Sequence, residues 1–340
     1  MQVVSFRDVD APTWDAFVES TPGGTFFHRY GWNRVIASAM GHRSESLAAV
    51  EGGQLCGILP LTHIRSPLFG QTLVSQAFCV RGGPVALDDK VSATLTEAAV
   101  ERAHALGVKE LEIRATVPAT ADWIGEQTYF NFSRALSADE DENMKAIPRK
   151  QRAMVRKGIQ AGLQVDVSTD VDVFYPIYAD SVHRLGTPVF PKRWFEALLQ
   201  EFPGACDITF ARHGDTIVAA VMSFYDGDTV LPYYGGGLPA ARAIKGYDFM
   251  YWALMARAAG NGYRRFDFGR SKAGTGPFSF KKNWGFTPEP LGYRYQLIRA
   301  TEHHLKNPDS PRYRRFVEAW KRLPPFVVNR IGPLIARDLG

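Results

Sequence analysis

The feature that most constrains this chain is an internal repeat. Residues 103–113 and residues 258–268 each read as a helix end, a glycine and a strand. A glycine in the left-handed conformation ends many helices, so this order predicts a helix that turns directly into a strand. The spacing between Gly107 and Gly262 gives the offset of the repeat.

A second pair of segments recurs ahead of the first pair, in the same order. Residues 47–61 and residues 207–222 each read as a strand, a tight turn with glycine and a strand, which is typical of a β-hairpin. Helix–glycine–strand units also occur in unrelated α/β proteins, and that alternative stays open, but the shared order favours duplication. We therefore expect an α/β fold with mixed sheets in two similar domains, 1–140 and 141–300, and a tail at 301–340.

The composition of the whole chain limits the classes of function. The formal net charge is +5, and residues 301–340 hold eight Lys or Arg against four Asp or Glu. The remainder is nearly neutral, which disfavours a protein that binds nucleic acid across its core. Cys56, Cys79 and Cys206 are too scattered for a disulfide framework, and we expect buried thiols in a reducing compartment. Without a signal-like start or a membrane-length apolar run, the sequence predicts a cytoplasmic protein.

A basic segment joins the two halves. An acidic run at residues 137–142 precedes a predicted helix that has Pro148 in its first turn. Arg149 and Arg152 share a face of this helix with Arg156. One interpretation is a solvated connector whose charge runs pair with each other. The other is an anion-binding helix that faces a phosphorylated substrate or a nucleic acid.

The tail at 301–340 combines basic and apolar residues. Phe316, Val317, Trp320 and Leu323 lie at helical spacing among Arg and Lys, and a second apolar segment follows at 326–335. A basic helix with Trp and Phe on one face suits an anionic membrane surface. The alternative is a C-terminal helix that packs on the core.

Residues 266–286 carry the strongest chemical signal. An aromatic strand runs into a glycine-bounded turn, and a lysine pair, Lys281 and Lys282, follows between Phe280 and Trp284. Cations fixed in an apolar wall can stabilise developing negative charge. No His, Cys and carboxylate set has zinc spacing, and no Ser-His-Asp or P-loop signature occurs, so we predict neither a metal nor a covalent enzyme intermediate.

Several blocks taken together resemble a known family. They are residues 25–32, 148–152, 183–190, 233–237, 266–270 and 280–286. Their order is similar to that in the FemAB-like transferases, in particular the branch associated with exosortase and exopolysaccharide loci. The resemblance runs from about residue 20 to the break at residues 307–308, and it includes the tail.

This resemblance implies two tandem GNAT-like acyltransferase domains and an N-acyltransferase or aminoacyltransferase. An acceptor amine would attack an activated acyl donor directly, in cell-envelope or exopolysaccharide synthesis. The donor, which is acyl-CoA, an acyl carrier protein or aminoacyl-tRNA, would be a co-substrate, with no tightly bound cofactor. The acceptor would be a small molecule or an envelope precursor. The alternative is a non-catalytic scaffold of the exopolysaccharide or exosortase system, held by its tail at the inner face of the cytoplasmic membrane.

The resemblance also implies roles for individual residues. Phe280 and Lys281 match a family pair that binds substrate and stabilises charge at the reacting carbonyl, whereas a surface lysine is the alternative. Asp267, on the opposite strand face from its aromatic neighbours, is a candidate base for the amine proton. It could instead pair with Arg265 or Arg270, and Arg270 is also a candidate substrate contact.

Further candidates lie outside this block. Tyr233 and Tyr234 end a strand and meet three glycines that would let backbone approach a ligand closely. Either phenol could orient the acceptor, with Tyr234 a catalytic candidate and Tyr233 a substrate-binding candidate. Substrate-binding candidates are His28 and Trp32, expected on one helix face, together with His183, Arg184, Arg149 and Arg152. Arg242, Lys245 and Gly246 precede a helix where GNAT enzymes hold donor phosphate, although only Gly246 stands where the usual coenzyme A loop is rich in glycine.

Overall fold

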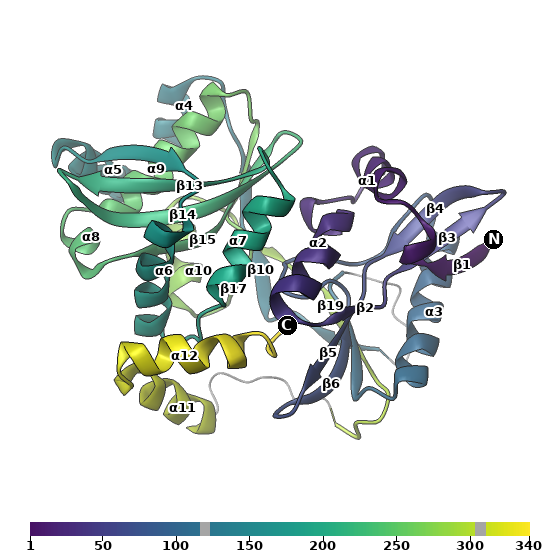
Figure 1. Ribbon diagram of the computed structural model, residues 1–340. Coiled ribbons are helices and arrows are strands. Elements are labelled where there is room, and N and C mark those ends of the chain that lie inside the picture. Colours follow the sequence, from purple (N-terminus) through teal and green to yellow (C-terminus); the bar gives the residue numbers. More distant parts are fainter. Residues whose placement is uncertain (116–122, 303–310) are drawn as a thin grey trace. The chain divides into compact units, whose positions relative to one another are not determined.

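The computed structural model describes residues 1–115, 123–302 and 311–340 (Figure 1). The chain divides into two compact units, neither of which is continuous in sequence. Unit 1 comprises residues 1–128, 291–307 and 337–340, and unit 2 comprises residues 129–290 and 308–336. Each unit has its own apolar core and its own sheets.

Unit 1 combines helices with two sheets. The helices are α1 (Ala11–Ser20), α2 (Tyr30–Val35) and α3 (Asp89–Leu106), with helical turns η1 (Phe6–Asp8), η2 (Phe26–His28) and η3 (Ile36–Met40). The strands are β1 (Gln2–Ser5), β2 (Arg43–Ser44), β3 (Leu47–Glu51), β4 (Gln54–Leu59), β5 (Thr62–Ser66), β6 (Gly70–Val74), β7 (Val85–Ala86), β8 (Glu110–Ile113), β9 (Ile124–Glu126) and β19 (Tyr293–Leu297). One sheet has the order β1-β3-β4-β7 and the other β2-β5-β6-β8-β19-β9.

Unit 2 also combines helices with two sheets. The helices are α4 (Glu140–Ala146), α5 (Arg149–Gln160), α6 (Val171–Leu185), α7 (Lys192–Glu201), α8 (Pro239–Ala243), α9 (Gly246–Gly260), α10 (Gly276–Asn283), α11 (Pro311–Arg322) and α12 (Pro325–Ala336). The strands are β10 (Tyr129–Asn131), β11 (Ser133–Ala135), β12 (Gln164–Ser168), β13 (Cys206–His213), β14 (Thr216–Asp226), β15 (Thr229–Gly237), β16 (Arg265–Asp267), β17 (Ser271–Lys272) and β18 (Glu289–Pro290). The sheet orders are β11-β16-β15-β14-β13-β12 and β17-β10-β18.

The internal repeat is confirmed by the strand pairing. In unit 1, β5 and β6 pair antiparallel, and the chain returns through α3 so that β8 pairs parallel with β6. In unit 2, β14 and β15 pair antiparallel, and the chain returns through α9 so that β16 pairs parallel with β15. Gly107 ends α3 with a φ of 62°, as the glycine of the helix–strand unit predicts. The expectation of an α/β fold with mixed sheets is therefore correct.

The compact units differ from the continuous ranges expected from the sequence. Strands β10 and β11, which precede residue 140, belong to unit 2. Strand β19, which precedes residue 300, lies between β8 and β9 of unit 1. The ranges 1–140, 141–300 and 301–340 remain a proposal for where the chain divides.

Candidate functional site

The turn that follows β16 is held by a carboxylate. Phe266 and Phe268 are buried in the core of unit 2, and Asp267 faces the other way, as strand alternation predicts. The Asp267 Oδ1 atom accepts the Gly269 N–H at 2.7 Å, where Gly269 has a φ of +65°. Its Oδ2 atom accepts the Asn131 Nδ2 group at 3.1 Å. Both carboxylate oxygens of Asp267 therefore accept hydrogen bonds from the protein, and these bonds fix the backbone at the end of β16.

Lys281 lies above the same turn. Helix α10 begins at a Thr275 cap, whose Oγ1 accepts the Phe278 N–H, and this register points Lys281 inward with 9% of its surface exposed. The Lys281 Nζ donates to the carbonyl oxygens of Phe268, Gly269 and Arg270 at 2.7, 3.0 and 2.9 Å. An ammonium has three N–H groups, so each of them has an acceptor.

The electrostatics of Lys281 are those of a buried cation. Burial is the main cause that lowers the pKa of the Lys281 ammonium to about 7. The positive charge of Arg270 lowers this pKa further, whereas the negative charge of Asp267 raises it. The Nζ atom also lies 5.5 Å from the centroid of the Phe132 ring. A cation held in this way can respond to negative charge that develops beside the turn.

Aromatic rings form one wall around this turn. The Phe280 ring lies 5.7 Å from Tyr251, 6.3 Å from Phe268 and 6.0 Å from Trp284, measured between ring centroids. The Arg270 guanidinium lies 4.7 Å from the centroid of the Tyr129 ring. The structure thus brings Lys281, Asp267, Phe280 and Arg270 together in unit 2.

Tyr233 and Tyr234 lie at a different place on the same sheet. Tyr234 is buried in an aromatic cluster, where its hydroxyl accepts the Trp194 Nε1–H at 3.0 Å and its ring lies 5.2 Å from Phe195. The Tyr233 ring packs against Phe224 at 5.4 Å. Core packing therefore accounts for Tyr234, and its role in orienting an acceptor remains a proposal.

The three glycines after these tyrosines were expected to follow the strand and approach a ligand. They continue β15 instead and approach helices. A Cβ on Gly236 would lie 2.8 Å from the Tyr178 backbone of α6, and a Cβ on Gly237 would lie 2.8 Å from the Tyr247 ring of α9. The small residues serve the packing of the sheet against its own helices, which corrects the sequence-based interpretation.

The expected donor-phosphate residues meet at the start of α9. Lys245 has a φ of +61° and precedes the helix, and its Nζ donates to the Arg242 carbonyl at 3.3 Å. Gly246 is buried against Ala241, where a Cβ would come within 3.0 Å. Asp248 in the first turn accepts the Gln151 side chain, and burial raises the pKa of this carboxyl group. The exposed Arg242 and the half-buried Lys245 thus flank a helix N-terminus.

The basic helix predicted after Pro148 is α5. It packs on α9 through Val155 and Gly158, both buried, and Gly158 lies close to Phe249. Arg149 is exposed on the helix, and Arg152 is half-buried. This arrangement suits a solvated basic face and leaves the anion-binding role a prediction.

His28 and Trp32 do not share a helix face. His28 ends the short turn η2, Trp32 lies in α2, and Arg29 between them has an extended ψ of 142°. The His28 Nε2 lies 3.0 Å from the Gly83 carbonyl oxygen and Nδ1 lies 2.8 Å from Thr25 Oγ1. The fully buried Trp32 donates its Nε1–H to the Ala77 carbonyl at 3.1 Å. Both side chains are part of the core of unit 1, which corrects the expected shared face.

His183 and Arg184 lie in the last turn of α6. The His183 Nε2 is 3.2 Å from the Trp320 carbonyl oxygen. Arg184 pairs with Asp180 at 2.9 Å and also donates to the Gly237 carbonyl. The structure places these side chains against α11 and the end of β15, and their substrate-binding role remains a prediction.

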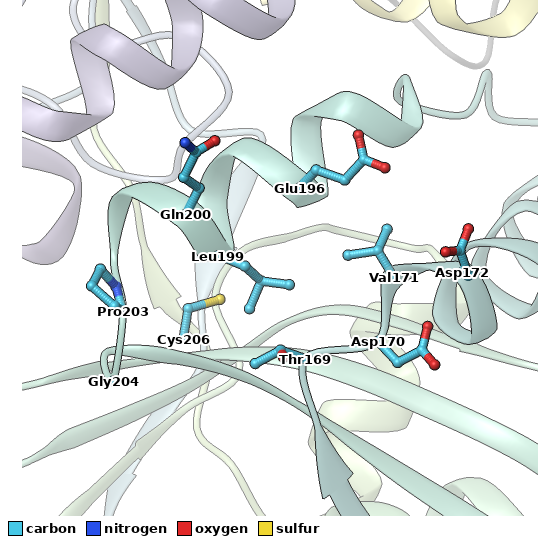
Figure 2. Close-up of a pocket in the computed structure, with 10 residues that line it drawn as sticks. All are labelled: Thr169, Asp170, Val171, Asp172, Glu196, Leu199, Gln200, Pro203, Gly204 and Cys206. Atoms are coloured by element: carbon cyan, nitrogen blue, oxygen red, sulfur yellow. The ribbon is translucent and has the colours of Figure 1, made fainter.

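A cavity of about 510 Å³ lies elsewhere on unit 2 (Figure 2). It is lined by Thr169, Asp170, Val171, Asp172, Glu196, Leu199, Gln200, Pro203, Gly204 and Cys206. Lys192 pairs with both Asp172 and Glu196. None of the residues that the sequence singled out for catalysis or binding lines this cavity.

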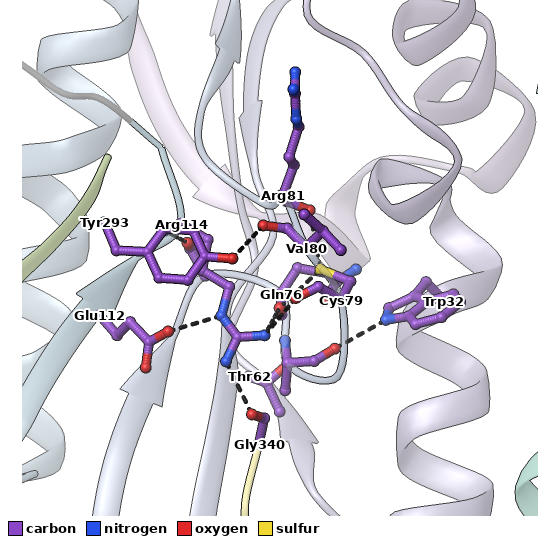
Figure 3. Close-up of polar contacts among 12 residues, drawn as sticks. Trp32, Thr62, Gln76, Cys79, Val80, Arg81, Glu112, Arg114, Tyr293 and Gly340 are labelled. Atoms are coloured by element: carbon purple, nitrogen blue, oxygen red, sulfur yellow. Dashed lines mark hydrogen bonds and ion pairs between the residues drawn. The ribbon is translucent and has the colours of Figure 1, made fainter. Parts of the chain in front are cut away.

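Sequence reasoning missed a buried arginine in unit 1. Arg114 follows β8 with 4% of its surface exposed and pairs with Glu112 at 2.8 Å. It donates to the carbonyl oxygens of Gln76, Cys79 and Gly340 at 3.3, 2.8 and 2.9 Å (Figure 3). One signal could have indicated Arg114, because it directly follows β8, the strand that corresponds to β16. Its acceptors lie far away in the sequence, and no local pattern predicts them.

The described residues contain neither a membrane-spanning helix nor a cluster of metal-ligating side chains. Within residues 1–115, 123–302 and 311–340, no helix combines the length and apolar character needed to cross a membrane. Across the described side chains, no three His, Cys, Asp or Glu residues converge on a point where a metal ion could bind.

Comparison with known proteins identifies the class of fold. Residues 144–282 match the acetyltransferase (GNAT) domain. The structure is similar to FemX, with a TM-score of 0.68 and 14% identity over 88% of this chain and 98% of that chain. It is also similar to a tandem GNAT protein from the clavulanic acid biosynthesis pathway, with a TM-score of 0.55 and 12% identity over 88% of this chain and 99% of that chain.

A third similar structure is L-PGS from Bacillus licheniformis, with a TM-score of 0.53 and 14% identity over 93% of this chain and 98% of that chain. A search of the curated proteins found no match. The fold is therefore two tandem GNAT-like domains, as the resemblance implied. Residues 144–282 thus match a GNAT acetyltransferase domain, and these neighbours show the similarity of the fold.

Proposed function

We propose that this protein is an N-acyltransferase or aminoacyltransferase whose reacting carbonyl lies beside the turn at residues 268–270. The observation that carries the proposal is the buried Lys281 ammonium, held over this turn in an aromatic wall. Lys281 also falls inside the matched acetyltransferase domain at residues 144–282. The acyl or aminoacyl group would come from acyl-CoA, an acyl carrier protein or aminoacyl-tRNA.

The proposed step is direct aminolysis. The acceptor amine attacks the acyl carbonyl, a C–N bond forms, and the bond from that carbonyl to the donor oxygen or sulfur breaks. Asp267 is the proposed base for the amine proton, because it lies on the same turn as Lys281. The negative charge of the tetrahedral intermediate is stabilised by the Lys281 ammonium, either through space or by exchange of one carbonyl for the oxyanion.

The test compares Lys281→Met with Lys282→Met in acyl transfer to lysine-like and amino-sugar acceptors. Lys282 is the adjacent, exposed lysine and gives a matched control. We expect Lys281→Met to lower kcat by about a hundredfold, the scale of losing one charge stabiliser, while Lys282→Met stays within about twofold. Thermal unfolding of each variant separates lost chemistry from lost fold.

Asp267→Asn gives an independent measurement, because an amide has nearly the shape of a carboxyl group. We expect kcat to fall, since the proton acceptor has been removed. Wild-type kcat values in both Lys281→Met and Asp267→Asn would exclude this site.

A second candidate function is a non-catalytic scaffold of the exopolysaccharide or exosortase system. The observation that favours it is the full set of carbonyl acceptors around Lys281, since a lysine with this geometry can serve the turn alone. A scaffold would show no transfer with any of the three donor classes. The resemblance supports a role in cell-envelope or exopolysaccharide synthesis on the cytoplasmic side, which belongs to the same proposal.

A further inference from the structure

We propose that α11 and α12 form a docking surface for an anionic lipid membrane. The two helices, drawn in yellow shades in Figure 1, both pack on α6 in unit 2. This surface is separate from the proposed chemistry, because it lies on these two helices and includes no residue of the Lys281 turn.

Helix α12 is apolar on two opposite sides. Val328, Gly332 and Ala336, spaced four residues apart, are buried and form the inner face. Phe326, Ile331 and Leu334 are 76%, 36% and 62% exposed. Phe326, Arg330 and Leu334 follow one another at the same four-residue spacing and are all exposed. They form an outer stripe in which the two apolar side chains flank Arg330. An ordinary surface helix places polar residues on that outer side.

Helix α11 contributes cations beside an aromatic pair. Trp320 is buried, and the Phe316 ring, 44% exposed, stacks on it with 5.8 Å between centroids. Arg315, Lys321 and Arg322 are exposed on the same helix. Aromatic and aliphatic side chains next to Lys and Arg are the composition of helices that lie at a membrane interface.

The helix pair is fixed to unit 2 by close contacts. A Cβ on Gly332 would lie 3.2 Å from the Val189 side chain, and a Cβ on Gly186 would lie 2.5 Å from the Val317 side chain. The Trp320 carbonyl lies within hydrogen-bond distance of His183. The exposed apolar stripe is therefore presented by packed helices.

Charge identifies the occupant of this surface. Residues 311–336 contain six Lys or Arg and one Glu, so they account for the whole formal net charge of +5, and the remaining sequence is neutral. A surface of negatively charged lipid headgroups attracts each of these cations and accepts Phe and Leu at its acyl boundary. Each helix has 12 residues, which suits a position in the interface plane.

The test measures sedimentation of the full chain with vesicles of phosphatidylglycerol mixed with phosphatidylcholine, and with pure phosphatidylcholine. We expect binding to the anionic vesicles only. Phe326→Ser/Leu334→Ser should weaken the partition coefficient by roughly tenfold or more, because two apolar side chains no longer insert. Lys321→Gln/Arg322→Gln should weaken it by roughly fivefold for each charge removed.

Leu68→Ser/Leu87→Ser is the matched control, because these two leucines of unit 1 are 74% and 65% exposed. It should bind anionic vesicles as the wild type does. Equal binding by the wild type and the Phe326→Ser/Leu334→Ser variant would overturn the proposal, as would no binding of the wild type. Retained binding to purely zwitterionic vesicles would contradict the assignment of anionic lipid.

Discussion

At the scale of single residues, both units use a buried cation to gather backbone carbonyl groups. Lys281 does so in unit 2 and Arg114 in unit 1. Each lies near the end of the strand that pairs parallel with its neighbour, at β16 and β8 respectively. Removing either charge would leave several buried carbonyl groups unsatisfied, at a cost of about 1–3 kcal/mol for each group. Lys281, the proposed charge stabiliser, is therefore also part of the fold.

His28 provides a pH-dependent prediction at the same scale. A carbonyl oxygen only accepts, so the Nε2 that faces Gly83 carries the proton, and the Nδ1 accepts the Thr25 hydroxyl. Burial of this neutral ring lowers its pKa to about 4, from an ordinary value of 6.5. Between those pH values the unfolded chain binds more protons than the folded chain. The free energy of unfolding therefore falls as the pH is lowered through this window.

The predicted loss is about 3 kcal/mol between pH 6.5 and pH 4, measured by urea unfolding as the difference between wild type and His28→Gln. His104→Gln, at an exposed position, is the control and should follow the wild type across the whole window. A wild-type curve parallel to that of His28→Gln would show that His28 does not titrate in this way.

The sequence could not place His28 or Trp32 correctly for a specific reason. Their spacing of four residues predicts one helix face, but the extended Arg29 between them separates two short helices. The partners that bury these side chains, Gly83 and Ala77, come from a loop far along the chain. Local periodicity carries no information about such partners.

At the scale of elements, the start of α9 combines backbone strain with positive charge. A lysine with a φ of +61° is disfavoured by about 1–2 kcal/mol, so an asparagine should fit the same backbone at Lys245 without loss. If the N-terminus of α9 holds donor phosphate, Lys245→Asn removes one charged contact. We expect the KM for the donor to rise roughly tenfold, with kcat unchanged.

Steady-state kinetics at varied donor concentration measure this effect, and urea unfolding verifies that the variant is stable within about 0.5 kcal/mol of the wild type. Lys145→Gln, on the exposed face of α4, is the control for charge lost elsewhere on unit 2. An unchanged KM for Lys245→Asn would remove the phosphate assignment at α9 while leaving the Lys281 proposal intact.

Elements that depend on local signals were predictable, whereas those defined by distant partners were not. The hairpins and the helix–glycine–strand units were predictable because turns and helix caps depend on residues that are neighbours in the sequence. Helix α10 was missed, although Thr275 as its cap and Pro277 in its first turn are recognisable signals. The glycines of β15 were misread because Tyr178 and Tyr247, which require them, lie on helices elsewhere in the sequence.

At the scale of the whole molecule, the last strand of unit 1 comes from the far end of the chain. Strand β19 lies between β8 and β9, and the Tyr293 hydroxyl donates to the Val80 carbonyl at 2.5 Å. The sequence repeat predicts two similar domains, but a strand of five residues gives no sign of which sheet it joins. The pairing of β19 shows that the chain returns to the sheet of unit 1 after it has passed through residues 129–290 of unit 2.

This topology predicts that residues 1–140 do not form a stable domain alone. The fragment lacks β19, so the facing edges of β8 and β9 lose their hydrogen-bond partner, and the Tyr293 and Gly340 contacts are absent. We expect residues 1–140 to show no cooperative thermal transition by near-ultraviolet circular dichroism. Residues 129–290 keep every strand of the six-stranded sheet of unit 2 and should unfold cooperatively.

Adding a synthetic peptide of residues 289–300 to the fragment 1–140 should restore part of its transition, whereas a peptide of the same composition in scrambled order should not. A cooperative transition in residues 1–140 alone would show that β19 is dispensable and that the continuous boundary at residue 140 describes the folding unit.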